Sequence, residues 1–411
     1  MPRYVIIGNG IAGVSAAETI RSLDPDSPLL MIAAEEFPPY SRPMISLLLE
    51  GAVTPERMII RPPDFYQRLG IEALVGHQVV ELDPQAARLR THRGESVAYD
   101  RLLIASGADP RPVEVPGGDM AGIFCMRTEA QVRGMLEMLP GVEQALVLGG
   151  GLVGFKAAYG LLHRGVKVTM LIRSPHPLAM QVDAHAGELI RRELEAHGLT
   201  VQVGVEVQEF WGEERVQGAL LSSGQKLDCQ LVVVGKGVRP ALDFLPPGQV
   251  KVDSGILVDA NLRTSLEGVY AAGDVAQALD SVRGRPWVNA IWPVAVEQGR
   301  VAGANLAGRP VSYRGSVGRN VMRIFGLDLM TAGLVNPPQD QEGYRVLAES
   351  DPRRGTYRRL VLRDGRLVGM VLLGEIEQGG VLLSLIQRGL PLAVEPEHLL
   401  EPSFNFASLM P

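Results

Sequence analysis

Apolar residues gather along the chain in short runs that are typical of strands buried on both faces. The first run covers residues 5–7 and leads through a glycine-rich turn into a helix predicted over residues 14–22. A further run at residues 29–33 predicts the next strand. The same order returns later in the chain, with a helix predicted at residues 155–164 and a strand at 166–172. This alternation predicts an α/β fold with parallel sheets.

The first turn carries glycines at the spacing of a dinucleotide cradle, at Gly8, Gly10 and Gly13. The first permits a tight turn, the second lets the backbone approach a pyrophosphate at the helix N-terminus, and the third lets the helix lie close to the strand. An acidic residue after the second strand completes such a fingerprint, and Glu35 and Glu36 both occupy that region. Glu35 is the favoured candidate for the adenosine ribose; the alternative is that both glutamates only solvate a loop.

The second turn repeats this spacing at Gly149, Gly151 and Gly154. Two complete fingerprints predict two bound dinucleotides, because each cradle holds one pyrophosphate. The alternative is a duplicated domain that has lost one of its ligands.

The end of the strand after the second cradle bears on the choice between NAD and NADP. Sites selective for NAD usually place a carboxylate there, but this chain has Ile172 followed by Arg173. An arginine without a competing carboxylate favours a 2′-phosphate. Arginine also stacks on adenine, so the sequence leaves NAD and NADP as alternatives.

Composition narrows the function classes. The chain has 411 residues, of which 46% are hydrophobic and 21% charged, and its formal net charge is −6. At about 150 residues per domain, this length predicts two or three domains. A pI near 5.8 gives nucleic-acid binding no electrostatic basis. The longest uncharged stretch, residues 4–17, is too short for a membrane span, and no secretory signal is recognisable, so we expect a soluble cytoplasmic protein.

Beyond the two fingerprints, the chain resembles the FAD-dependent pyridine nucleotide-disulfide oxidoreductases. The segments that carry the resemblance are residues 102–108 (LLIASGA), 231–240 (LVVVGKGVRP), 269–275 (VYAAGDV) and 292–299 (WPVAVEQG). Residues 39–44 (PYSRPM) and 365–389 are similar to the branch that contains rubredoxin and nitrite reductases.

The resemblance implies two Rossmann-like dinucleotide-binding domains of the three-layer ββα type and a small C-terminal α/β domain. An FAD domain is expected in two parts, residues 1–110 and 242–310. The NAD(P) domain is expected between them at 111–241, and an interface domain at 311–411.

The resemblance also implies site residues. In addition to the first glycine set and the glutamates, the FAD contacts expected from it are Arg42, Ala105, Gly107, Gly273, Asp274, Pro293 and Gln298. Asp274 is expected at the ribityl and pyrophosphate region, and Pro293 and Gln298 at a helix start that faces the flavin. Arg173 and Gly235 join the second glycine set at the NAD(P) site.

The chain departs from its disulfide-reducing relatives in its cysteines. The loop at residues 37–46, where those relatives carry a redox cysteine, contains none. Cys125 and Cys229 lie in the NAD(P) segment, where a buried apolar role is expected. Thiol chemistry is therefore excluded, and electrons must leave the flavin for a protein redox centre, a quinone-like molecule or oxygen.

A second departure concerns a lysine–glutamate pair beside the flavin in ferredoxin-reductase relatives. Leu47 stands at the lysine position and Lys156 at the glutamate position. We expect Lys156 to lie unpaired near the flavin or the nicotinamide, where a cation raises the flavin potential or orients the carboxamide. With Arg42 and Pro43 it forms the predicted catalytic set, and no metal is required. The alternative is a surface lysine on the outer face of the helix.

The function that follows is hydride transfer between nicotinamide and flavin, linked to an iron–sulfur or rubredoxin-like protein. Similar FAD subunits occur in complexes with carbon monoxide dehydrogenase or tungsten aldehyde oxidoreductase, so this chain is a candidate subunit of a larger redox complex. The alternatives are a self-contained NAD(P)H oxidase and a non-enzymatic FAD-binding redox sensor.

Two further segments have open roles. Residues 353–366 hold six arginines and one acid, which fits either a docking patch for an acidic partner or a solvated hairpin. The tail at residues 395–411 either packs on this chain or contacts a neighbouring subunit.

Overall fold

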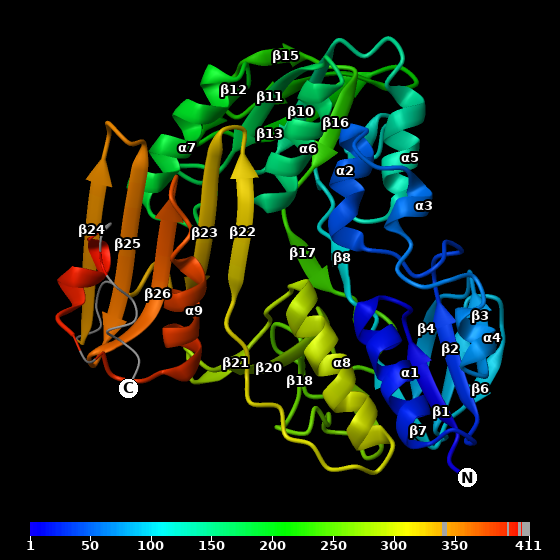
Figure 1. Cartoon of the computed structure of the whole chain (residues 1–411). Coiled ribbons are helices and arrows are strands. Elements are labelled where there is room, and N and C mark those ends of the chain that lie inside the picture. Colours follow the sequence, from blue (N-terminus) through cyan, green and yellow to red (C-terminus); the bar gives the residue numbers. More distant parts are fainter. Residues whose placement is uncertain (339–342, 393, 402–403, 405–411) are drawn as a thin grey trace.

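The structure is a computed structural model that describes residues 1–338, 343–392, 394–401 and 404 (Figure 1). Two five-stranded parallel sheets and a five-stranded antiparallel sheet form its frame. This arrangement confirms the predicted α/β class, with two Rossmann-like sheets and a smaller C-terminal α/β unit.

The first parallel sheet has the order β19-β7-β1-β2-β3. Its strands are β1 (Tyr4–Ile7), β2 (Leu29–Ala33), β3 (Ile71–Val75), β7 (Arg101–Ile104) and β19 (Val269–Ala271). In β1, Tyr4 and Ile6 pack on α1 (Ile11–Leu23) and α8 (Trp292–Leu306). Val5 and Ile7 pack on the other side, towards a small sheet of β4 (Val79–Asp83), β5 (Arg88–Thr91) and β6 (Ser96–Ala98). Both faces are covered, which explains the uninterrupted apolar run.

The second parallel sheet repeats this plan in the order β12-β11-β10-β16-β9. Its strands are β9 (Ile123–Cys125), β10 (Gln144–Leu148), β11 (Lys167–Ile172), β12 (Thr200–Val203) and β16 (Leu231–Val234). Val147 faces α6 (Leu152–His163), whereas Leu146 and Leu148 face a second small sheet. That sheet consists of β13 (Val207–Gly212), β14 (Val216–Leu221) and β15 (Lys226–Asp228).

Helices α1 and α6 both begin earlier than the sequence pattern indicates, at Ile11 and Leu152 instead of residues 14 and 155. Gly10 and Gly151 have extended backbones and serve as the N-caps. The third glycine of each motif therefore belongs to the first helical turn and not to the loop. The strand at residues 29–33 is confirmed without change.

Shorter elements connect the sheets. A two-stranded antiparallel ribbon joins β8 (Ala108–Pro110) to β17 (Val238–Pro240), so the two crossover segments run side by side. A three-stranded sheet contains β18 (Ile256–Leu257), β20 (Ala276–Asp280) and β21 (Arg285–Trp287). The remaining helices of this region are η1 (Arg42–Met44), α2 (Ile45–Glu50), α3 (Pro55–Met58), α4 (Phe65–Arg68), α5 (Glu129–Met138) and α7 (Ala184–Ala196).

The C-terminal sheet is antiparallel, in the order β22-β23-β26-β25-β24. Its elements are β22 (Arg319–Ile324), β23 (Leu327–Gly333), β24 (Tyr344–Asp351), β25 (Thr356–Arg363), β26 (Arg366–Leu373), α9 (Gly379–Arg388) and η2 (Pro396–Leu400). Helix α9 covers one face through Leu382 and Ile386, which are buried against Leu372 and Met370 of β26.

The tip of the β22–β23 hairpin joins this sheet to the helices of the second parallel sheet. The ring of Phe325 stacks on His197 with centroids 4.2 Å apart and contacts Tyr159 at 5.0 Å. Next to it, the Gly326 amide donates a hydrogen bond of 3.1 Å to Glu193 Oε1. The C-terminal sheet is therefore docked by a specific contact with α6 and α7.

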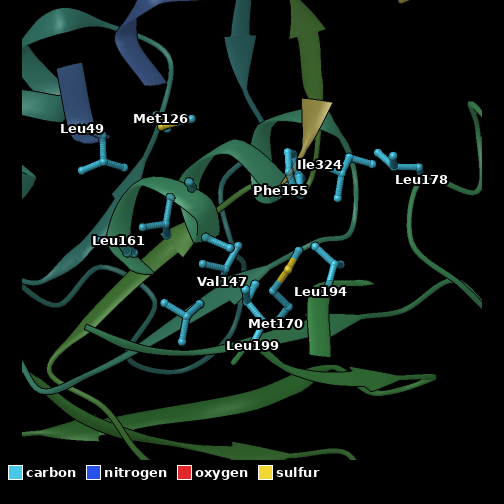
Figure 2. Packing of buried hydrophobic residues seen from close by; sticks show 14 of the residues in the cluster. Leu49, Met126, Val147, Phe155, Leu161, Met170, Leu178, Leu194, Leu199 and Ile324 are labelled. Atoms are coloured by element: carbon cyan, nitrogen blue, oxygen red, sulfur yellow. The ribbon is translucent and has the colours of Figure 1, made fainter. Parts of the chain in front are cut away.

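One hydrophobic core contains residues of α2, of the second parallel sheet with its helices, and of the C-terminal sheet (Figure 2). It contains Leu49 of α2, Phe155 of α6 and Ile324 of β22, with 0%, 4% and 0% of their surfaces exposed. Burial of such side chains contributes about 1.5–3 kcal/mol each. The region between the two cradles is thus held by apolar packing from three distant stretches of sequence.

Candidate active site

The first cradle has no room for side chains at two of its three glycines. Gly8 has a φ of +102°, and a Cβ there would lie 2.2 Å from the carbonyl oxygen of Ala105. A Cβ on Gly13 would lie 2.0 Å from the carbonyl oxygen of Gly8. Around Gly10, by contrast, no atom of a residue beyond its chain neighbours lies within 4 Å of the Cβ position. The turn is closed on its protein side and open at the helix N-terminus, which fits a pyrophosphate.

The second cradle repeats this geometry. Gly149 has a φ of +108°, and its Cβ position lies 2.5 Å from the carbonyl oxygen of Gly235. The Cβ position of Gly154 lies 2.0 Å from the carbonyl oxygen of Gly149, and that of Gly151 is open. The structure therefore brings Gly235 beside the cradle, as it brings Ala105 beside the first.

The turn that carries Asp274 packs against the start of α1. Gly273 has a φ of +81°, and its amide donates a hydrogen bond of 2.8 Å to Gln298 Oε1. Gln298 is 2% exposed, so its amide oxygen is committed to this turn. Pro293, the second residue of α8, is exposed. The structure thus gives Gln298 a positioning contact that the sequence pattern did not indicate.

Asp274 forms an ion pair that sequence reasoning missed. Arg127, two residues after β9, places Nη2 2.7 Å from Asp274 Oδ2. Its Nε donates to the Ala108 carbonyl oxygen at 2.9 Å, and its Nη2 lies 3.7 Å from the Cβ position of Gly107. Arg127 stands in no motif, so no sequence signal marks it.

Glu35 and Arg42 come together in a second polar cluster. Arg42 Nη2 forms an ion pair with Glu35 Oε1, and Tyr40 donates a hydrogen bond of 2.8 Å to Glu35 Oε2. Burial raises the pKa of Tyr40, which keeps its hydroxyl a donor. Arg42 Nη1 also donates to the carbonyl oxygen of Arg127 at 3.1 Å, which links the two clusters. The Glu36 side chain is 83% exposed and lies 3.7 Å from Arg93, so of the two glutamates only Glu35 belongs to this polar cluster.

Lys156 lies on the face of α6 that approaches α2. Gly160, one turn further along, would place a Cβ 3.2 Å from Leu49 Cγ and from the Glu50 amide. Burial lowers the pKa of Lys156. No carboxylate, carbonyl or hydroxyl within the described residues pairs with it, and Leu47 at the family's lysine position is 36% exposed. A half-buried, unpaired cation therefore sits on the helix that follows the second cradle, which disagrees with a fully exposed lysine on the outer helix face.

The expectation that Arg173 has no competing carboxylate is wrong. Glu206 Oε2 lies 3.8 Å from Arg173 Nε, and Glu206 Oε1 lies 3.9 Å from Lys236 Nζ. Glu206 follows β12, a separate strand, so the end of β11 alone did not reveal it.

Burial disfavours the thiolate form of both cysteines. Burial raises the pKa of Cys125, and burial together with Asp228 raises that of Cys229 to about 12. Both are free cysteines. Among the residues that the structure describes, no group of three or more metal-ligating side chains occurs, and no helix is long and apolar enough to cross a membrane.

The arginine-rich segment uses most of its charge within the chain. Arg354 pairs with Glu375 at 2.5 Å, and Arg358, only 8% exposed, donates to Gln378 at 2.7 Å. Two more arginines of the segment have partners within the chain. Arg359 pairs with Asp183, and Arg363 donates hydrogen bonds to the Tyr344 hydroxyl and the Val282 carbonyl oxygen. The segment covers β25 and the turn into β26, and its free positive charge is smaller than the sequence indicates. Most of the tail, at residues 402–403 and 405–411, lies outside the described residues.

Two glycine cradles, one on each of two parallel sheets, are typical of an enzyme that binds two dinucleotides. The chain belongs to the pyridine nucleotide-disulphide oxidoreductase family, whose profile matches residues 2–299. Residues 319–390 match the rubredoxin NAD+ reductase C-terminal domain. Members of this family are oxidoreductases that bind FAD and NAD(P)H.

Several known proteins are similar in sequence to this chain over most of its length. A nitrite reductase [NAD(P)H] of Bacillus subtilis is 31% identical over 388 residues, 94% of this chain and 47% of that protein. An assimilatory nitrate reductase electron transfer subunit from the same organism is 28% identical over 97% of this chain and 51% of its own length. The chain thus spans about half the length of these two relatives. The epsilon subunit of NADH-dependent phenylglyoxylate dehydrogenase from Aromatoleum evansii is 32% identical over 94% of this chain and 91% of its own length.

Solved structures share the fold. The covalent putidaredoxin reductase–putidaredoxin complex aligns with a TM-score of 0.90 at 24% identity, over 100% of this chain and 98% of the other. The ferredoxin reductase for the CYP199A2 system of Rhodopseudomonas palustris aligns with a TM-score of 0.87 at 25% identity, over 99% of both chains.

Proposed function

We propose that this chain passes electrons between NAD(P)H and an iron–sulfur or rubredoxin-like protein, as the NAD(P)-reacting subunit of a larger redox complex. The observation that carries the proposal is the pairing of two complete cradles with a loop at residues 37–46 that holds no cysteine. Without a thiol to accept electrons, the route out of the flavin leads to an external centre. The names of the relatives support such a partner, since two are subunits of larger enzymes and one was captured with a redox protein.

We assign the groups that hold the two coenzymes as follows. The N-termini of α1 and α6, opened by Gly10 and Gly151, hold the two pyrophosphates. Glu35 accepts hydrogen bonds from the adenosine ribose of FAD, and Asp274 faces its ribityl and pyrophosphate region. The FAD part comprises residues 1–110 and 242–310, the NAD(P) part 111–241, and the interface part 311–411.

The remaining residues set the conditions for the reaction. Bound FAD would supply a flavin ring suited to hydride transfer from nicotinamide and to one-electron transfer onward. Arg42 and Pro43 shape the entrance of α2, and Arg42 is held there by Glu35, Tyr40 and the Arg127 carbonyl oxygen. Lys156 supplies an unpaired positive charge that raises the flavin potential.

Anaerobic stopped-flow absorbance tests the proposal. Purified flavoprotein is mixed with NADH or NADPH and then, in a second mixing step, with oxygen, methyl viologen or reducible rubredoxin. We expect NADH or NADPH to bleach the flavin within seconds or faster. The reduced flavin should then react slowly with oxygen and at least tenfold faster with viologen or rubredoxin. Rapid peroxide formation would instead identify an NAD(P)H oxidase. Failure of both nucleotides to bleach the flavin would identify a binding protein or redox sensor.

A further inference from the structure

Three charged side chains from three separate strand ends meet beside the second cradle. Glu206 lies 3.8 Å from Arg173 and 3.9 Å from Lys236, one carboxylate oxygen facing each cation. The side chains are 83% exposed for Arg173, 43% for Glu206 and 31% for Lys236. The cluster is therefore open to a ligand and carries one more positive than negative charge.

The backbone ties two of these positions to the cradle. The Cβ position of Gly150 lies 2.8 Å from the side chain of Ile172, the residue before Arg173. The Cβ position of Gly149 lies 3.4 Å from the amide nitrogen of Lys236. In a Rossmann domain this edge, at the end of the second strand, is where the ribose of the adenosine lies.

Glu206 is held in place through its main chain. The Gly204 amide donates to the Ile172 carbonyl oxygen at 2.7 Å, which carries the pairing of β11 and β12 to the strand end. The Glu206 amide then donates to Ser222 Oγ at 3.1 Å, and the Ser222 amide donates to the Glu206 carbonyl oxygen at 2.8 Å. These bonds fix the main chain of Glu206 at the edge of the cradle and leave its side chain 43% exposed.

We propose that Glu206 makes the second cradle selective for NADH over NADPH; this rests on the proposed nucleotide role of that cradle. Its carboxylate accepts a hydrogen bond from the 2′-hydroxyl of the adenosine ribose. It also pairs with Arg173 and Lys236, the two cations that would otherwise bind a 2′-phosphate. A phosphate group carries about −1.5 to −2 charge at neutral pH and is repelled by the carboxylate. The acid that distinguishes NADH from NADPH therefore follows β12. The end of β11, where such an acid usually stands, has only Ile172 and Arg173.

The test compares the folded flavoprotein with its Glu206→Gln variant, using adenosine 2′,5′-bisphosphate and 5′-AMP as probes in calorimetric titrations. We expect the original chain to bind 5′-AMP at least as tightly as the bisphosphate. In Glu206→Gln we expect bisphosphate binding to tighten about tenfold while 5′-AMP changes by less than about threefold. The ratio of kcat/KM for NADPH to that for NADH should rise by a similar factor.

Matched variants separate the possible failures. Glu209→Gln, an exposed carboxylate on β13 outside the cluster, should leave both affinities unchanged. Adding Arg173→Gln to Glu206→Gln should reverse the gain in bisphosphate binding. Preference of the original chain for the bisphosphate, or an unchanged ratio in Glu206→Gln, overturns the role of Glu206. Absence of binding by both probes, with no flavin reduction by either nucleotide, overturns the nucleotide role of the second cradle itself.

Discussion

Replacing Lys156 by methionine removes a half-buried cation that has no hydrogen bond or ion pair among the described residues. Methionine keeps an unbranched chain of similar length and has a similar helix propensity, so α6 itself is unaffected. Burial lowers the pKa of Lys156, which means that the charged form is less stable in the folded protein than in water. We therefore expect Lys156→Met to raise the free energy of unfolding at neutral pH by about 1 kcal/mol, the order of the penalty for burying a polar group without a hydrogen-bond partner.

The dependence on pH has a defined sign. Between the lowered pKa of the folded state and the ordinary value of 10.5, the unfolded chain binds the proton and the folded chain does not. The stability contributed by this lysine therefore rises with pH across that window. The gain in the free energy of unfolding of Lys156→Met over the original chain should therefore shrink as the pH rises between these two pKa values. Above 10.5 it should stay constant.

The same substitution tests the place of Lys156 beside the flavin. An interaction of about 1–2 kcal/mol between the ammonium group and the reduced cofactor corresponds to about 20–40 mV for a two-electron couple. We expect the midpoint potential to fall by this amount in Lys156→Met, and further in Lys156→Glu.

Guanidinium unfolding and a dye-coupled redox titration measure the two effects, with Lys167→Met on the exposed edge of β11 as the control. Lower stability of Lys156→Met at neutral pH would refute the reasoning from unpaired burial. A potential and a hydride-transfer rate equal to those of the control would show that Lys156 lies away from the flavin.

Three further variants probe the cradles and the docking of the C-terminal sheet. In Gly154→Ala the new methyl group meets the Gly149 carbonyl oxygen at 2.0 Å, so flavin reduction by NAD(P)H should slow at least tenfold while FAD stays bound. Gly13→Ala makes the same clash in the first cradle, and the absorbance of bound flavin should show loss of FAD instead. Phe325→Ala removes two aromatic contacts and should lower the free energy of unfolding by about 2 kcal/mol in denaturant titrations. Val321→Ala, at a side chain 63% exposed, should change it by less than about 0.5 kcal/mol, and equal losses in both variants would contradict the docking contact.

Local features of this protein follow from its sequence. Gly8 and Gly149 adopt backbone conformations that other residues avoid, and the neighbouring strands are apolar on both faces, so spacing and hydrophobicity identify both cradles. The helix starts were misplaced by three residues, because the third glycine of each motif looks like loop in the sequence yet lies in the first helical turn.

Charge pairing is decided by the tertiary structure. Arg127 meets Asp274 although 147 positions separate them, and Glu206 meets Arg173 only because β11 and β12 are neighbours in one sheet. Arg359 likewise finds Asp183 across the docked C-terminal sheet, which removes charge from a segment that looks strongly basic. The sequence gives the charge of each side chain. The effect of that charge depends on its distance from other charges and on its burial, and packing between elements far apart in the chain sets both.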